Sequence, residues 1–122
     1  MAKHNETGTW GEQLAADKLE SEGYTILDRN WRTGSFEIDI VARKENEVVF
    51  AEVKTRRDKE EDPLEAIDAR KISHMASAAE LWLSTHHEPW VPRFDLFAVR
   101  GIPDDYDLEH IPDAFYPPLK KY

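Results

Sequence analysis

Two segments decide the fold: FEIDIVA at residues 36–42 and VVFAEVK at residues 48–54. Both alternate apolar with charged residues, which is typical of half-buried β-strands. A polar break between them is centred on Glu45-Asn46. A hairpin loop of two or four residues there places Asp39 directly opposite Glu52, and Glu37 opposite Lys54, whereas a loop of odd length breaks this register.

In that register, alternation with period 2 puts all four charged residues on one face of the sheet. Directly opposed side chains have Cβ atoms about 4.5–5.5 Å apart, and like charges at that distance destabilise the sheet. Asp39 and Glu52 therefore need a compensating cation. A divalent metal ion is the natural candidate, and Lys54 lies beside it in the expected register.

The simpler interpretation is a solvated hairpin face on which Glu37 and Lys54 form a cross-strand ion pair, worth only about 0.2–1 kcal/mol. It does not explain why the residues between the charges are so apolar. A hairpin this apolar on its second face is expected near the centre of a domain, with its charged face lining a cleft or meeting a helix.

Composition is that of a soluble globular protein, with 122 residues, 40% hydrophobic and 34% charged, and we expect one domain spanning residues 1–122. No apolar run approaches the roughly 20 residues that span a bilayer, so no membrane partner is expected. The N-terminus does not resemble a secretory signal, which favours a cytoplasmic location. The absence of cysteine excludes disulfides, thiolate metal sites and cysteine nucleophiles.

Charge argues against a general attraction to nucleic acid. The 16 basic and 25 acidic residues leave a net charge of −9, which repels a polyanion at long range. Any binding of DNA or RNA must therefore depend on a local basic surface or on a metal ion. Clustered acidic residues are also what a metal-dependent nuclease requires.

The order of expected elements is helix, three strands, helix, strand and tail, which predicts a mixed α/β fold with helices packed on a small central sheet. The first helix covers about residues 9–22 and ends at Gly23, and a strand follows over 24–31. Asp62-Pro63-Leu64-Glu65 carries the start signals of a second helix running to about residue 84. Its buried stripe is expected to contain Ile72, Met75, Ala79 and either Trp82 or Leu83. After a strand over 93–100, the tail has room for a short helical turn near 111–115.

Glu12 lies on the apolar side of the first helix, which is unusual for a carboxylate without a partner. Thr9-Trp10-Gly11-Glu12 also fits the capping box, in which Glu12 would only satisfy a backbone N–H group at the helix start. Together with Asp39 and Glu52, a role in the acidic site becomes the stronger hypothesis.

Basic residues near the acidic pair are candidates for phosphate contacts. Lys54 follows Glu52 by two residues and points the same way, which suits stabilisation of negative charge on a phosphate. Arg56 extends the same face. Further members of a basic strip would be Arg29, Arg32, Arg70 and Lys71.

These residues resemble the PD-(D/E)xK nuclease superfamily, which has the restriction-endonuclease-like fold. A helical Glu is followed by an Asp and, about a dozen residues later, by Glu-x-Lys. More closely, the chain is similar to the YraN-like family of small bacterial proteins, which is similar to archaeal Holliday-junction resolvases. That resemblance covers nearly the whole chain and is carried by WGE at 10–12, GY at 23–24, NWR at 30–32, EID at 37–39, FAEVKTR at 50–56 and RFD at 93–95.

The resemblance implies a restriction-endonuclease-like core and a metal-dependent endonuclease. By it, Asp39 and Glu52 bind Mg²⁺ or Mn²⁺ with help from the Val53 carbonyl, and Glu12 supports the metal directly or through water. Lys54 orients or activates the attacking water. Hard oxygen ligands suit these ions better than zinc. The expected contacts to nucleic acid come from Arg32, Arg56 and Lys71.

Three functions are compatible with the sequence. The first is a metal-dependent endonuclease acting on branched or otherwise structured DNA, for which a homodimer is the simplest way to face two strands. The second is a nucleic-acid-binding protein of nuclease fold with little or no turnover. The third is a protein-interaction module whose acidic pocket binds metal only as a structural feature.

Overall fold

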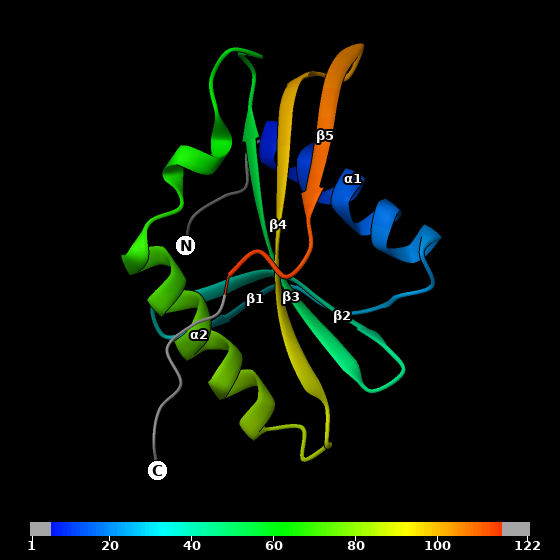
Figure 1. The fold of residues 1–122 in the computed structure, drawn as a ribbon, viewed down its shortest axis with the longest axis vertical. Coiled ribbons are helices and arrows are strands. Elements are labelled where there is room, and N and C mark those ends of the chain that lie inside the picture. Colours follow the sequence, from blue (N-terminus) through cyan, green and yellow to red (C-terminus); the bar gives the residue numbers. More distant parts are fainter. Residues whose placement is uncertain (1–5, 116–122) are drawn as a thin grey trace.

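In the computed structural model, which describes residues 6–115, two α-helices cover a five-stranded sheet (Figure 1). The strands are arranged in the order β1-β2-β3-β4-β5, and only β3 and β4 run parallel. This mixed sheet confirms the expected α/β class. The elements in chain order are α1 (Glu6–Ser21), β1 (Thr25–Thr33), β2 (Phe36–Lys44), β3 (Glu47–Arg56), the 3₁₀ helix η1 (Pro63–Ala66), α2 (Ala69–Ser84), β4 (Val91–Ile102) and β5 (Asp105–Ile111).

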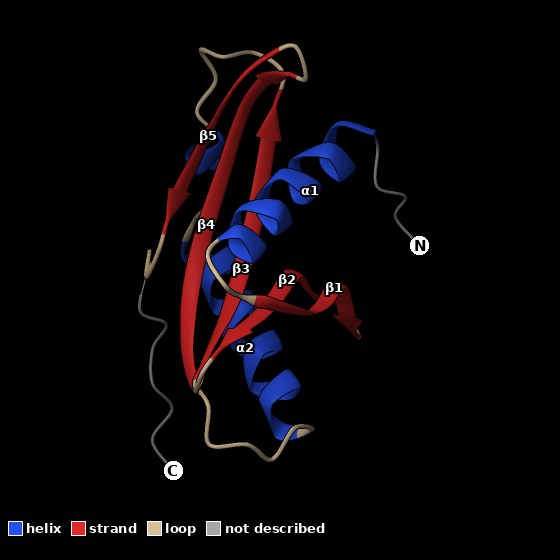
Figure 2. Cartoon of the chain, turned by 90° about the vertical axis from the view of Figure 1, so that its right-hand side faces the viewer, coloured by secondary structure: helices blue, strands red, loops and turns tan. Residues whose placement is uncertain are grey.

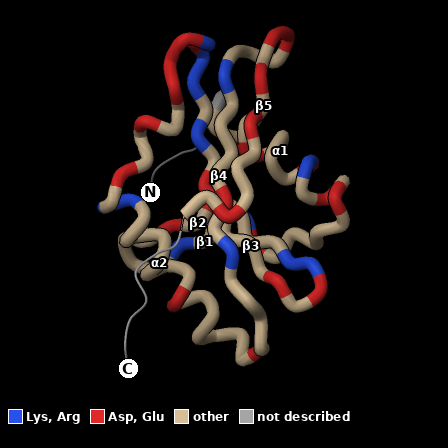
Figure 3. The backbone as a smooth tube through the Cα atoms, in the orientation of Figure 1, with Lys and Arg blue, Asp and Glu red and all other residues tan. Residues whose placement is uncertain are grey.

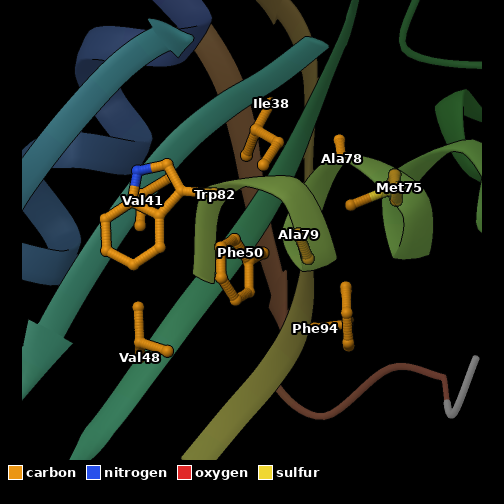
Figure 4. Close-up of a cluster of buried hydrophobic side chains, with 9 residues drawn as sticks. All are labelled: Ile38, Val41, Val48, Phe50, Met75, Ala78, Ala79, Trp82 and Phe94. Atoms are coloured by element: carbon orange, nitrogen blue, oxygen red, sulfur yellow. The ribbon is translucent and has the colours of Figure 1, made fainter. Parts of the chain in front are cut away.

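The two helices lie on opposite faces of the sheet (Figure 1), and each face has its own apolar core. On the α2 face, Trp82 and Met75 pack with Phe50 and Phe94 (Figure 4). On the α1 face, small residues let the helix approach the strands closely. The buried members there are Ala15, Ala16, Leu19, Ile40, Ala42, Val49, Ala51 and Phe97. Burial on both faces is why the strand segments are so apolar.

Gly23 ends α1 as predicted. Its φ is +94°, a conformation that costs glycine little because it has no Cβ. The N–H of Gly23 donates to the carbonyl of Glu20 at 3.0 Å, and the N–H of Tyr24 donates to the carbonyl of Leu19 at 3.0 Å. These two bonds form a Schellman motif, which directs the chain back toward β1.

The expected helix from Asp62 to residue 84 is wrong in its first part. Asp62 caps only the short helix η1, since its side chain accepts from the N–H of Leu64. Ile67 and Asp68 are then extended, and Asp68 caps α2 by accepting from the N–H of Lys71 at 2.9 Å. A second capping residue six positions on therefore starts a new helix. The end at Ser84 is as expected, but the buried stripe is Met75, Ala78, Ala79 and Trp82.

The tail contains a fifth strand that the sequence pattern did not predict. β5 pairs antiparallel with β4, from Leu96 opposite Ile111 to Ile102 opposite Asp105. Its acidic, largely exposed residues are poor strand formers, and pairing with a central strand overrides that propensity. The helical turn expected near 111–115 is absent, because residues 112–113 form a plain turn.

Candidate active site

The sheet divides between β2 and β3. Their ladder runs from Lys44 opposite Glu47 to Ile40 opposite Ala51 and stops there. β3 stays paired with β4 as far as Arg56, whereas β2 stays paired with β1 back to Phe36. Figure 2 shows β1 and β2 turning away from the long strands β3, β4 and β5. The expected hairpin register is confirmed, and the acidic pair lies just beyond the last ladder pair, at the fork.

Asp39 substitutes for the missing ladder bond. Its Oδ2 accepts a hydrogen bond from the N–H of Val53 at 2.8 Å. The N–H and C=O of one residue point to the same side of an extended strand, so the Val53 carbonyl also faces the fork. This arrangement brings two carboxylates and a backbone carbonyl to one place. The carboxylate pair was expected from the hairpin register, and the Val53 carbonyl from the family resemblance.

The two carboxyl groups at the fork interact directly. Asp39 forms a side-chain hydrogen bond with Glu52, and only 5% of Glu52 is exposed. Burial, followed by the hydrogen bond and the negative charge of Glu52, raises the pKa of Asp39 well above its usual value. The raised pKa means that a negative charge on both carboxylates is unfavourable here, and that bound positive charge would relieve it.

Lys71 of α2 supplies one positive charge. Its Nζ lies 2.7 Å from Oε2 of Glu52. Burial lowers the pKa of Lys71, but the charge of Glu52 and its hydrogen bond outweigh that effect, so the pKa is raised overall. Lys71 was predicted to contact nucleic acid from a basic strip, whereas the structure places it inside the acidic site.

Glu12 reaches the fork from the opposite face because α1 lies close to β3. A Cβ on Gly11 would lie 2.0 Å from Oγ1 of Thr55, so only glycine fits there without a shift. Glu12 is 5% exposed and adds to the field that raises the pKa of Asp39. The capping-box alternative is wrong, because α1 begins at Glu6 and Thr9 therefore lies within the helix.

Together these residues enclose an open, polar cavity of about 270 Å³. All four predicted catalytic residues line it, and so do Val53, Arg56 and Lys71. Lys54 is on its wall beside Glu52, as the alternation of β3 predicted. The full lining is Gly8, Glu12, Glu37, Asp39, Glu52, Val53, Lys54, Thr55, Arg56 and Lys71.

The expected basic strip is largely neutralised by carboxylates. Arg32 does not line the cavity, and its Nη2 lies 3.3 Å from Oε2 of Glu37. Arg56 lies 3.3 Å from Glu61. Arg29 instead donates to the neutral side-chain amide of Gln13 and keeps its charge. Figure 3 shows basic and acidic segments interspersed on the same elements. Phosphate binding at the cavity would therefore depend on the few cations that line it.

The donor set fits a hard divalent cation. Mg²⁺ is commonly held by one or two carboxylates together with waters and substrate phosphates, and Asp39 with Glu52 supplies two carboxylates. Among the residues that the structure describes, no three His, Asp or Glu side chains are grouped closely enough to hold an ion by themselves. Glu12 lines the same cavity as this carboxylate pair.

The residue types alone did not reveal a second buried polar cluster. Asp95 is fully buried and accepts from Arg93 at 2.8 and 2.7 Å, from Nε2 of His110 at 2.7 Å and from the N–H of Asp113 at 3.0 Å. Burial alone would raise the pKa of Asp95, but the bonds from His110 and Arg93 hold it below its usual value. This cluster fastens the edge strand β5 and the turn after it to β4.

No helix among residues 6–115 has the length and apolar character needed to cross a membrane.

Comparison with known proteins identifies the family. A family model described as "Uncharacterised protein family UPF0102" matches residues 11–99. A UPF0102 protein of Bacteroides thetaiotaomicron is 47% identical over 120 residues, covering 98% of this chain and 99% of its own length. Another, from Syntrophotalea carbinolica, is 44% identical and covers 88% of this chain and 89% of its own length.

Among solved structures, the chain is similar to the Holliday junction resolvase Hjc of Archaeoglobus fulgidus. The TM-score is 0.53 with 17% identity, and the match covers 87% of this chain and 77% of that chain. At this identity the likeness concerns the fold, and it confirms the expected restriction-endonuclease-like core.

Proposed function

This chain belongs to the UPF0102 family, and on that premise we propose that it is a metal-dependent endonuclease that hydrolyses phosphodiester bonds in branched or structured DNA. The observation that carries the proposal is the fork, where Asp39 and Glu52 interact with each other. Lys54 lies on the wall of the same cavity. A purely structural hairpin gains nothing from holding two carboxylates together.

In this proposal each residue of the cavity has a distinct part. Asp39, Glu52 and the Val53 carbonyl would hold Mg²⁺ or Mn²⁺, and Glu12 would orient a water molecule beside it. When bound, the ion would neutralise charge on the phosphate and lower the pKa of a coordinated water. Lys54 would stabilise the negative charge that develops during in-line attack, because it lines the cavity beside Glu52, where a phosphate would bind. Arg56 would contact a neighbouring phosphate.

The charge of the chain supports the need for a cation. With a net charge of −9 and four carboxylates around the cavity, the metal-free surface repels a phosphodiester. A divalent ion at Asp39 and Glu52 would reverse that repulsion at the one place where a phosphate must approach. We therefore expect DNA binding at the cavity to require metal.

The test is cleavage of labelled four-way junction, flap, single-stranded and duplex DNA, with and without Mn²⁺. We expect metal-dependent cleavage of at least one branched substrate. Lys54→Ala should retain metal binding, since an ammonium has no lone pair for a metal, and should lose most cleavage. Glu52→Gln should lose both.

Two outcomes would overturn the proposal. If Lys54→Ala cuts at the wild-type rate, the assigned mechanism is wrong. If the wild type binds these substrates with metal but cuts none of them, a nucleic-acid-binding protein of nuclease fold is the better description.

A further inference from the structure

The ammonium of Lys71 is paired with Glu52, a carboxylate proposed to bind the metal ion. Its Nζ lies 2.7 Å from Oε2 of Glu52, a carboxylate whose side chain is only 6% exposed. Lys54, which belongs to the Glu-x-Lys motif, lies two residues from Glu52 on the same strand. The lysine that pairs with Glu52 is instead Lys71, which belongs to α2 and lines the same cavity.

The backbone of Lys71 is fixed by α2, whereas its long side chain can change rotamer. Asp68 caps α2 by accepting from the N–H of Lys71, and the helix is anchored by Met75, Ala79 and Trp82. The side chain itself is 32% exposed and has four rotatable carbons. Nζ can consequently leave Glu52 without any movement of the helix.

An ammonium and a divalent cation compete for Glu52. Both are attracted by the same pair of carboxylates, and they repel each other at the short distance that sharing Glu52 imposes. We propose that Lys71 is a tethered counter-ion, which occupies Glu52 in the metal-free protein and transfers to a substrate phosphate when a divalent cation binds. This inference rests on the proposed function, because it takes the acidic pair as a cation site and DNA as the ligand.

The destination of the released ammonium follows from the lining of the cavity. Lys71, Lys54 and Arg56 all border the same opening. A phosphate bound to the cation at Glu52 would lie within this ring of positive charge. The transfer conserves the number of ion pairs, since Lys71 exchanges a carboxylate for a phosphate. It also couples the two binding events, so that bound metal raises the affinity for DNA and bound DNA raises the affinity for metal.

The first experiment measures Mn²⁺ binding without DNA, by calorimetry, for the wild type, Lys71→Met and Lys18→Met. The control Lys18→Met breaks an exposed ion pair between Lys18 of α1 and Glu22, just beyond the end of that helix, and neither residue lines the cavity. Removing the competing charge should tighten Mn²⁺ binding about tenfold in Lys71→Met, and the control should bind as the wild type does. Without metal, Lys71→Met should melt at a lower temperature than the wild type, and saturating Mn²⁺ should abolish that difference.

The second experiment measures how the affinity for a four-way junction depends on salt in the presence of Ca²⁺, which supplies a hard cation. Loss of one phosphate contact should reduce the slope of log K against log salt concentration by about 0.9 in Lys71→Met but not in Lys18→Met. An unchanged slope would overturn the transfer to phosphate.

The outcomes separate this inference from the proposed function. If wild type and Lys71→Met are both folded and bind Mn²⁺ equally, the tethered counter-ion is refuted while the metal site stands. If Mn²⁺ binds to neither protein, the proposed function fails and this inference fails with it.

Discussion

The close approach of α1 to β3 at Gly11 can be tested by adding one methyl group. In Gly11→Ala the new Cβ would lie 2.0 Å from Oγ1 of Thr55, 3.2 Å from its Cβ and 3.5 Å from its Cγ2. Thr55 is β-branched, so its χ1 is restricted and Oγ1 cannot turn away freely from the new methyl group. The helix must therefore move away from the strand.

Two effects of opposite sign determine the magnitude. Replacing a helical glycine by alanine favours the helix by about 1 kcal/mol. Overpacking a tight core contact costs about 1–3 kcal/mol. Because the contact with Oγ1 is far below van der Waals distance, we expect the second effect to dominate, with a net loss of about 1–2 kcal/mol. Glu12, the next residue, should be displaced with the helix, so Mn²⁺ affinity should fall as well.

The assay is urea denaturation of Gly11→Ala, Thr55→Ala and the double variant, with Mn²⁺ titration of each. The double variant removes Oγ1 and Cγ2 and should regain most of the stability and metal affinity that the single variant loses. The reasoning is refuted if Gly11→Ala is more stable than the wild type, or if Thr55→Ala gives no rescue.

Three further predictions concern other parts of the molecule. The pKa of Asp95 is lowered in the folded state, so its contribution to stability is present above about pH 4 and is lost as the pH falls further. Asp95→Asn should cost about 3 kcal/mol of stability at neutral pH and should weaken the acid dependence of unfolding in denaturation curves. A curve with unchanged pH dependence would contradict this. Asp68→Ala should destabilise the protein by about 1 kcal/mol through loss of the α2 cap, and an effect below a few tenths would argue against that cap. Sedimentation at micromolar concentration should show a C₂ dimer, whereas a strict monomer would exclude a preformed enzyme with two sites.

The hairpin at the centre of the fold could be predicted from sequence because two constraints agree there. Alternation fixes which residues share a face, and the short Glu45-Asn46 turn fixes the register. The observed ladder, from Lys44 opposite Glu47 to Ile40 opposite Ala51, has that register. The ending of the β2–β3 ladder before Asp39 was not predictable. It depends on the separate pairing of β2 with β1 and of β3 with β4.

Other features depend on tertiary context. β5 has acidic residues that disfavour strands, and it forms because the edge of β4 is available. Asp62 and Asp68 both carry capping signals, and the sequence alone does not show that the chain uses both. Lys71 falls off the buried stripe of α2, so its approach to Glu52 becomes visible only once the helix is placed on the sheet.

The central claim is that Asp39 and Glu52 form a cation site, and the most direct test is thermal melting during Mn²⁺ titration of the wild type and Asp39→Asn. The pKa of Asp39 is raised in the folded state, so its contribution to stability is lost as the pH rises through that pKa. Metal-free Asp39→Asn should therefore melt above the wild type at neutral pH. At an Mn²⁺ concentration of about 100 times Kd, the wild type should gain about 2.7 kcal/mol, or roughly 10 °C, and Asp39→Asn should gain almost nothing. An equal rise in both proteins would contradict the claim.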